Sequence, residues 1–391
     1  MWQLTLEDGG TLQASAVVSA VGQLGRPRVP DIAGRDEFAG PTWHSARWDH
    51  GTDLAGRRVA VLGTGASAIQ FVPEIAKTAA HVDVFQRSAP YILPKSDRPY
   101  RPREQALYDR LPVLAKADRL RIFLYGELLT SGFVVSPKLL AAPMQLWRRQ
   151  LRAITDPELR AKCVPGYLMG CKRVLFSDDW YPTLTRPNVE LITDPIERIA
   201  PAGVVTAGGA SHPADVLIYA TGFQTLDFLA PMSLTGLGGR QLQAEWRDGA
   251  EAYLGMTVSG FPNFFMLYGP NTNLGHNSII FMIECQANYI LSCLKAMDQT
   301  GSSTIDLRRE VMDAFDAVQQ KELEQRVWAT TGKSWYKNDA GRITNNWSGS
   351  TIRYWWNTIR ADPTLYQFEG RRASEDLRVA VPTVEPTLTA D

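Results

Sequence analysis

The chain has 391 residues, and its 41 Lys and Arg balance its 41 Asp and Glu, so the formal net charge is zero. Neutrality excludes the long-range positive field by which proteins attract nucleic acids and anionic membranes. Hydrophobic residues make up 45% and charged residues 21%, as in a globular protein, and the length suggests two or three domains at about 150 residues each. The four cysteines include no Cys-x-x-Cys pair, which argues against a cysteine zinc site or a redox motif. Four are also few for a disulfide-stapled secreted protein, so we expect a cytoplasmic protein without a metal site.

The first 22 residues predict a β-hairpin. Trp2–Leu6 alternates polar and apolar side chains as a strand does, Asp8-Gly9-Gly10 supplies the turn, and Leu12–Val21 returns. This start has the pattern of a strand and not of a signal peptide. No apolar run reaches the roughly 18 residues that span a bilayer, so no membrane segment is expected.

The end of that hairpin has a counterpart later in the chain. The Val-rich run 16–22 ends in Gly22, and the similar run 216–222 ends in Gly222. Glycine at a strand end lets the backbone come close to a ligand, so the two runs predict equivalent ligand-facing strand ends. Chance similarity of two Val-rich strands is the alternative.

Residues 57–88 form the clearest unit, a βαβ beginning of about 30 residues. An apolar strand, 58–62, leads into a Gly-x-Gly-x-x-Ala turn, a helix expected over 66–80, and a second strand, 81–85. In such a turn the first glycine permits the bend, the second admits a pyrophosphate, and the small third residue lets the helix pack on the strand. The dinucleotide site predicted here consists of Gly63, Thr64, Gly65, Ala66, Ser67 and Ala68, and a tight turn without a ligand is the alternative.

The residues that follow the second strand indicate whether NAD or NADP binds. An NAD site places an acid there to hold the ribose hydroxyls, whereas this strand runs into Arg87 and Ser88. A guanidinium suits a 2′-phosphate, so NADP is favoured over NAD. Asp83 is acidic but lies about four residues too early for the ribose.

The remaining segments predict further α/β structure. Residues 102–163 are rich in Leu, Arg and Ala at helical spacing and indicate a helical insertion, and residues 188–222 return to short strands. Residues 259–296 indicate strand, loop and helix, and residues 306–330 a charged amphipathic helix. We therefore expect an α/β protein with Rossmann-like domains.

A segment just before the βαβ unit carries a more specific pattern, Phe-x-Gly-x-x-x-His-x-x-x-Trp-Asp. It is formed by Phe38, Gly40, His44, Trp48 and Asp49. This resembles the fingerprint of the type I Baeyer–Villiger monooxygenases, within the flavin-containing monooxygenase superfamily. Three further segments resemble parts of the same family: 171–176, 220–223 and 268–278.

The resemblance implies an activity and roles for single residues. The family reduces FAD with NADPH, and the C4a-peroxyflavin formed with O2 inserts one oxygen beside a ketone carbonyl. Arg173 matches the arginine that stabilises the anionic intermediates, a task for a group that is always protonated. Lys172 and Arg87 match residues that bind the 2′-phosphate, and His44 matches a histidine that acts structurally or couples domain motion.

Two more segments are assigned to FAD by the resemblance. Thr221 and Gly222 match a flavin-side strand end. Asn277 and Ser278 precede a predicted helix, 279–294, whose N-terminus would stabilise negative charge on the reduced flavin. Asn and Ser are also good caps of an ordinary helix that faces no ligand, which is the alternative reading.

The sequence departs from the family in one respect: a strand with the Gly-x-Gly-x-x-Gly turn for the ADP half of FAD is not found. Three accounts fit: a fragment or mis-started frame of a normal enzyme, an FAD half supplied by a separate chain, or a relic that binds nucleotide without turnover. The expected organisation is therefore an incomplete FAD segment with the linker (1–50), an NADP domain (51–215), and a return to the FAD domain (216–391). Rival functions are an N- or S-oxygenating flavin monooxygenase and a non-catalytic NADP-binding module.

Overall fold

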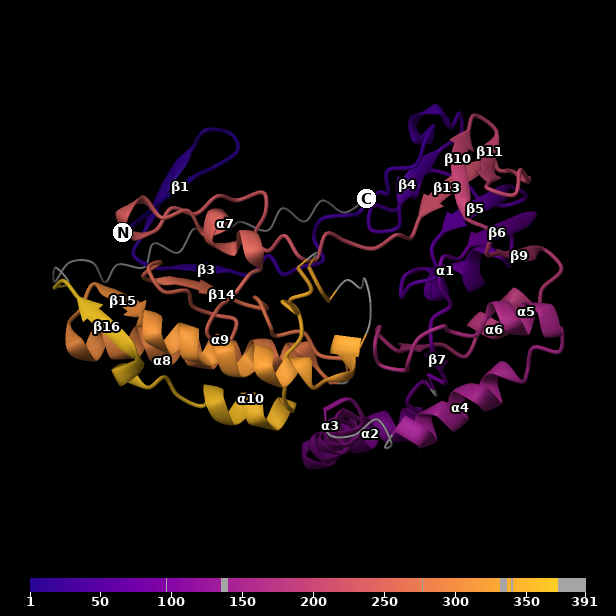
Figure 1. Ribbon diagram of the computed structural model, residues 1–391. Coiled ribbons are helices and arrows are strands. Elements are labelled where there is room, and N and C mark those ends of the chain that lie inside the picture. The colour runs from indigo at the N-terminus through magenta and orange to yellow at the C-terminus, as the bar shows by residue number, and fades with distance from the viewer. Residues whose placement is uncertain (96, 135–139, 276, 331–335, 339, 372–391) are drawn as a thin grey trace.

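The computed structural model describes residues 1–371 except 96, 135–139, 276, 331–335 and 339, and shows two lobes (Figure 1). One lobe, which we call the dinucleotide lobe, is built on a five-stranded parallel sheet in the order β4-β13-β5-β6-β9. The strands are β4 (Thr42–His44), β13 (Val216–Tyr219), β5 (Arg58–Leu62), β6 (His81–Phe85) and β9 (Val189–Ile192). The α/β fold with a parallel, Rossmann-like sheet is thus present.

Both faces of this sheet are covered, which explains why its strands are apolar without alternation. Val59 and Val61 of β5 pack with the helix α1 (Ala68–Ile75), whereas Ala60 and Leu62 face the other side. There a small antiparallel sheet covers them, made of β10 (Ile196–Ala200), β11 (Gly203–Thr206) and β12 (Ser211–Pro213). Helix α1 is shorter than the expected range 66–80.

The expected range of the NADP domain, 51–215, leaves out two of its strands. β4 precedes that range and β13 follows it, yet both pair inside the five-stranded sheet, with Ile218 of β13 beside Val61 of β5 and Trp43 of β4. The chain therefore enters this lobe before the fingerprint histidine and leaves it after β13. Parallel pairing between strands about 155 residues apart leaves no local mark on the sequence.

The other lobe, which we call the C-terminal lobe, combines the first 19 residues with residues after 228. The predicted hairpin is only partly right: β1 (Trp2–Thr5) pairs with β2 (Thr11–Ala14), but the expected return strand breaks at Ser15. β3 (Val17–Ser19) instead pairs in parallel with β14 (Phe264–Met266). Asn263 fixes this arrangement, because its buried side-chain amide donates to the carbonyls of Ser15 and Ser303 at 2.7 and 2.9 Å.

The rest of the C-terminal lobe is helical, with one antiparallel strand pair at its edge. The expected helix over 306–330 begins as a strand, because residues 304–307 pair with 366–369. The elements are α7 (Leu242–Glu245), α8 (Ile279–Thr300), β15 (Thr304–Leu307), α9 (Arg309–Glu324), α10 (Thr351–Thr358) and β16 (Tyr366–Glu369), with short 3-10 turns at Val327–Thr330 and Pro363–Leu365.

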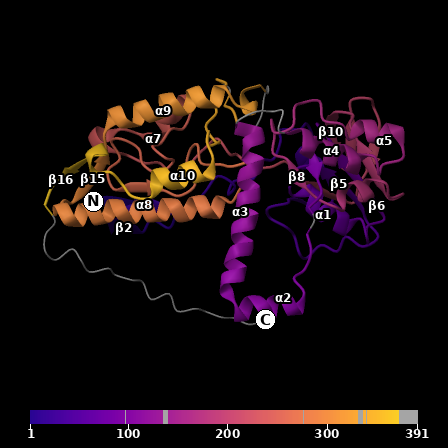
Figure 2. The ribbon, with the colours of Figure 1, turned by 90° about the horizontal axis from the view of Figure 1, so that it is seen from below.

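The segment expected as a helical insertion, 102–163, forms four helices, and its residues 135–139 lie outside the described part of the chain. These are α2 (Pro102–Arg110), α3 (Pro112–Val134), α4 (Ala141–Leu151) and α5 (Pro157–Lys162), followed by α6 (Trp180–Leu184). The short strands β7 (Ile92–Leu93) and β8 (Leu175–Phe176) flank the insertion and pair with each other. Helix α3 stands between the two lobes and passes beside the ends of α8 and α10 (Figure 2).

Helix α8 is the one described helix that is long and apolar enough to cross a membrane. By itself this is weak evidence, since a buried core helix of the same length passes the same test. Here Met282, Tyr289, Cys293 and Met297 of α8 lie in the core of the C-terminal lobe.

Candidate active site

The dinucleotide turn lies where β5 ends beside β13. Gly63 has a φ of +111°, and a Cβ there would come within 2.5 Å of the carbonyl oxygen of Ala220, so only glycine fits. Gly65 has no atom within 4 Å of the place a Cβ would take, which leaves open space in front of the turn. Ala68 is fully buried where α1 begins. The turn is therefore closed toward the sheet and open outward, at the N-terminus of a helix.

Two cations stand beside this turn. The Gly63 backbone N–H donates to the Phe85 carbonyl oxygen at 3.0 Å, which brings the end of β6, and hence Arg87, next to the turn. Lys172, far along the chain, donates from Nζ to the Ser88 hydroxyl at 3.0 Å and lies 4.6 Å from the centre of the Tyr167 ring. Burial, and then the positive charge of Arg87, lowers the pKa of Lys172. Among the described residues neither cation has a carboxylate partner, so the pair suits an anion.

The next residue, Arg173, lies near two tyrosines of the C-terminal lobe. Its guanidinium opposes the rise in pKa that burial gives the phenols of Tyr268, after β14, and Tyr336. Arg173 itself is exposed and forms no ion pair within the described ranges of the chain. Consecutive residues thus present one cation to each lobe.

The strand end after β3 lies beside the strand end after β14. A Cβ on Gly22 would lie 3.6 Å from the Tyr268 ring, and the hydroxyl of Tyr268 donates to Asn273 at 2.8 Å. Gln23 lies next to Tyr268 with 5% of its surface exposed, and its amide N and O form no geometrically sound hydrogen bond. In most proteins a buried amide of this kind bonds a neighbouring group, ordered water or a ligand.

The other predicted strand end, Thr221 and Gly222, follows β13 and lies in the linker between lobes. Residues 20–41 form the incoming linker, from β3 to β4, and residues 220–228 form the outgoing linker after β13. The Arg28 N–H donates to the Gly222 carbonyl at 2.8 Å, so the two linkers are hydrogen-bonded to each other. The two Gly-ended runs are therefore not neighbours in one sheet: Gly22 follows a strand of the C-terminal lobe and Gly222 a strand of the dinucleotide lobe.

His44 lies at the end of β4 between these linkers. Its Nδ1 accepts from the Ala46 N–H at 3.1 Å, and its ring meets that of Phe223 edge-on, with centroids 5.6 Å apart. Burial lowers the pKa of His44, opposed by the backbone of Gly222. A neutral, packed imidazole of this kind joins the two linkers.

The other fingerprint residues fasten the linker to the dinucleotide lobe. Trp48 packs edge-on against Phe71 of α1, with centroids 5.1 Å apart, and Phe38 is buried beneath the sheet. A Cβ on Gly40 would come within 2.4 Å of the Asp215 carbonyl oxygen. Asp49 accepts from the Thr52 hydroxyl at 2.6 Å, a contact that lowers the pKa of Asp49, and so closes a local turn.

Asn277 and Ser278 do stand at the start of α8, and Ser278 caps it by accepting from the Phe281 N–H at 3.2 Å. The amide of Asn277, however, donates to Glu127 of α3 at 2.8 Å. Its contacts are thus with the helical insertion. His276 of the same loop lies outside the described residues.

The sequence interpretation did not single out Gln23, Tyr167 or the side chain of Tyr268 as site residues. Gln23 directly follows Gly22, so the predicted ligand-facing strand end was a signal for it. Tyr167 is brought under Lys172 only by tertiary packing, and no local pattern marks it.

Comparison with known proteins gives this geometry its context. Residues 2–121 match a family model described as flavin-binding monooxygenase-like. A Baeyer–Villiger monooxygenase of Pseudomonas aeruginosa is 40% identical over 369 residues, which is 94% of this chain and 70% of that protein.

Solved structures agree. An oxidised steroid monooxygenase bound to NADP superposes with a TM-score of 0.81 at 26% identity, over 94% of this chain and 78% of that one. The structure of OTEMO in complex with FAD and NADP gives a TM-score of 0.80 at 26% identity, with the same coverage.

The chain belongs to the Baeyer–Villiger monooxygenases. The resemblance found in the sequence and the prediction of a flavin-dependent monooxygenase with Rossmann-like domains are confirmed.

The two glycines of the turn give a matched pair of variants. Gly63→Ala forces a Cβ onto the Ala220 carbonyl at a positive φ, so the free energy of unfolding should fall by about 2–4 kcal/mol. Gly65→Ala meets no protein atom, so stability should stay within about 0.5 kcal/mol while NADPH binds at least about tenfold more weakly.

Urea unfolding and a fluorescence titration with NADPH measure the two effects. Unchanged NADPH affinity in Gly65→Ala would mean that no pyrophosphate approaches this turn.

Proposed function

We propose that this Baeyer–Villiger monooxygenase binds NADPH at the turn 63–68, binds FAD at the seam between the lobes, and inserts oxygen beside the carbonyl of a ketone. The observation that supports this most is the pair Lys172 and Arg173, which present one cation to each lobe. Lys172 would bind the 2′-phosphate of NADPH, and Arg173 would stabilise the negative charge that develops near the flavin during oxygen insertion.

The NADPH site is argued from charge and space. Gly65 leaves room for a pyrophosphate, and the start of α1 offers N–H groups and a partial positive charge. Arg87 and Lys172, with the hydroxyl of Ser88 between them, match the two negative charges of a 2′-phosphate. Asp83, the acid weighed for a ribose contact, instead bonds His81 at 3.0 Å within the sheet.

The FAD site is argued from polar atoms that lack partners. The amide of Gln23 has both a donor and an acceptor to offer, and it lies beside Gly22 and Tyr268, where the flavin-facing end of β3 is expected. When bound, the reduced flavin supplies the activation of O2. The contribution of this chain is to hold the ring against the seam and to keep its surroundings cationic.

Arg173 is the residue of this chain that we assign to the oxygen-insertion step. Its guanidinium stays protonated at any working pH, so it lowers the energy of a developing anion without giving up a proton that would quench it. Its positive charge acts on Tyr268, which follows β14 beside the strand end that would face the flavin. N- or S-oxygenation is the rival activity, because amines and sulfides need no stabilised anion on the substrate.

We also propose that the FAD site is completed by a strand–turn–helix segment that carries a Gly-x-Gly-x-x-Gly turn, from an upstream part of the protein or a separate chain. Within the described residues β3 pairs only with β14, so one of its edges is free. Val18 and Val21 are exposed there, as expected for a strand that lacks a neighbour in a parallel sheet.

We further propose a cytoplasmic location, because the four cysteines are buried and form no disulfide.

Removal of either phosphate-facing cation should change the choice of nucleotide. Each charge-assisted contact contributes about 1.5–3 kcal/mol, so Arg87→Ala should raise the KM for NADPH about 10- to 100-fold and leave that for NADH nearly unchanged. Lys172→Ala should act in the same direction. Steady-state oxidation of both nucleotides measures this, and Arg57→Ala, an exposed arginine before β5, is the control. Equal losses for NADPH and NADH would contradict a 2′-phosphate site.

Arg173 separates the two oxygenation chemistries. In flavin-loaded protein, Arg173→Ala should reduce kcat for a cyclic ketone at least about 100-fold, because a fixed cation near the developing anion is lost. Oxygenation of a thioether should fall far less, and Arg173→Lys should recover part of the ketone activity. Product analysis by gas chromatography with both substrates measures the ratio; a ketone activity that survives in Arg173→Ala would favour the rival.

Flavin retention tests the completed site. The 391-residue chain, purified alone, should retain little FAD, because the pyrophosphate of FAD lacks its glycine-rich turn. Co-expression with a segment bearing such a turn should give a yellow protein with about one flavin per chain, measured by absorbance after gel filtration. A stoichiometric flavin band in the chain alone would refute the proposal.

A further inference from the structure

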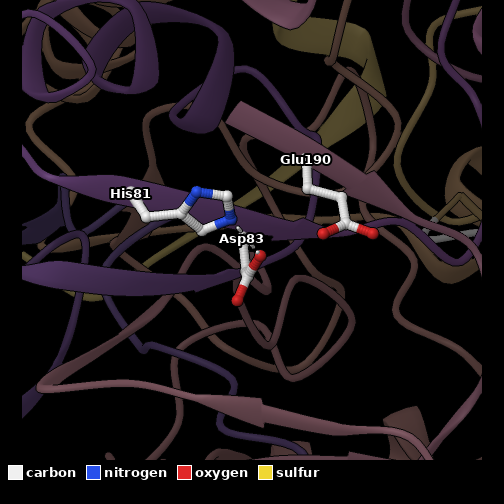
Figure 3. A group of neighbouring side chains, drawn as sticks. All are labelled: His81, Asp83 and Glu190. Atoms are coloured by element: carbon white, nitrogen blue, oxygen red, sulfur yellow. Dashed lines mark hydrogen bonds and ion pairs between the residues drawn. The ribbon is translucent and has the colours of Figure 1, made fainter. Parts of the chain in front are cut away.

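A cluster of metal-ligating side chains lies in the dinucleotide lobe, outside the site described above. His81 and Asp83 are two residues apart on β6 and therefore point to the same face of the sheet. Asp83 pairs in register with Glu190 of the adjacent parallel strand β9. One ligand atom from each of these three residues lies within 4.8 Å of the others, and the three side chains converge (Figure 3).

This cluster places two carboxylates close together with little positive charge beside them, which is electrostatically unfavourable. Asp83 is 5% exposed, and burial raises its pKa, to which the negative charge of Glu190 adds. Among the described residues no Lys or Arg forms an ion pair with either carboxylate, and Arg58, on the next strand, is engaged with Asp215 at 2.8 Å. The imidazole of His81, whose Nε2 lies 3.0 Å from Asp83, and the more distant His212 of β12 are basic groups that act on Asp83.

We propose that His81, Asp83 and Glu190 form a binding site for one Zn²⁺ ion. A divalent cation between two carboxylates removes their mutual repulsion more completely than one imidazole can. One ring nitrogen and carboxylate oxygens are ligands that zinc accepts at about 2.0–2.2 Å, and the 3.0 Å separation of His81 and Asp83 is close to that of two ligands on one ion. A water molecule from the exposed side of Glu190 would complete the tetrahedron.

The position of the cluster indicates a structural metal and not a catalytic one. The ligands lie on the body of β6 and β9, whereas the nucleotide turn and Arg87 lie past the carboxyl ends of the strands. At about 3.3 Å per residue, Asp83 is roughly 13 Å from Arg87 along the chain. An ion here ties β9, the edge strand, to β6 next to the β10–β12 sheet. It would therefore stabilise the lobe without touching the cofactor.

The test uses the 391-residue protein without a histidine tag, stripped of metal by a chelator and titrated with Zn²⁺ in a calorimeter. One equivalent should bind, the thermal midpoint should rise, and Co²⁺ in place of Zn²⁺ should give the visible absorption of a tetrahedral site. Glu190→Gln, which keeps the shape of the side chain, and His81→Gln should each weaken binding at least about tenfold.

Glu197→Gln, an exposed carboxylate on β10, is the matched control and should leave the affinity unchanged. Circular dichroism shows whether each variant is folded. Absence of saturable binding by the wild-type protein would overturn the proposal whatever the variants do. So would Zn²⁺ binding that Glu190→Gln and Glu197→Gln weaken equally, or that Mg²⁺ reproduces.

Discussion

One short segment, residues 171–174, contacts both lobes of this protein and positions two cations between them. Cys171 is buried against the C-terminal lobe, where its Sγ lies 3.4 Å from the Val327 carbonyl, and Val174 is buried in the dinucleotide lobe. The two residues between these anchors must lie in the seam. Lys172 contacts Ser88 and Tyr167 of the dinucleotide lobe, and Arg173 lies near Tyr268 and Tyr336 of the C-terminal lobe.

The residues of the fingerprint Phe-x-Gly-x-x-x-His-x-x-x-Trp-Asp hold the linkers between the lobes in place. Its aromatic residues and Gly40 fasten the incoming linker to the sheet and to α1, and His44 joins that linker to the outgoing one near Phe223. These contacts are packing and backbone contacts, with no proton transfer implied. The fingerprint therefore helps to fix where the turn 63–68 stands relative to the strand ends at Gly22 and Gly222.

Helix α3 is a second connection between the lobes. Glu127 accepts from Asn277 at 2.8 Å and from the Thr351 N–H at the start of α10 at 3.2 Å, and Phe123 packs on Phe281 of α8 with centroids 5.0 Å apart. One carboxylate thus serves the N-terminal ends of two helices, where a negative charge is favourable. The helical insertion consequently holds α8 at the position it takes beside the seam.

The sequence alone determined the parts of this protein whose cause is local. The glycine spacing at 63–68, the arginine after β6 and the fingerprint are short-range patterns, because a tight turn or a close backbone approach restricts which residues can stand there. Only the tertiary structure decided the rest: that β4 and β13 join the dinucleotide sheet, that Asn277 meets α3, and that His81, Asp83 and Glu190 converge. Those contacts join residues up to about 175 positions apart, and register between distant strands depends on packing that no local pattern records.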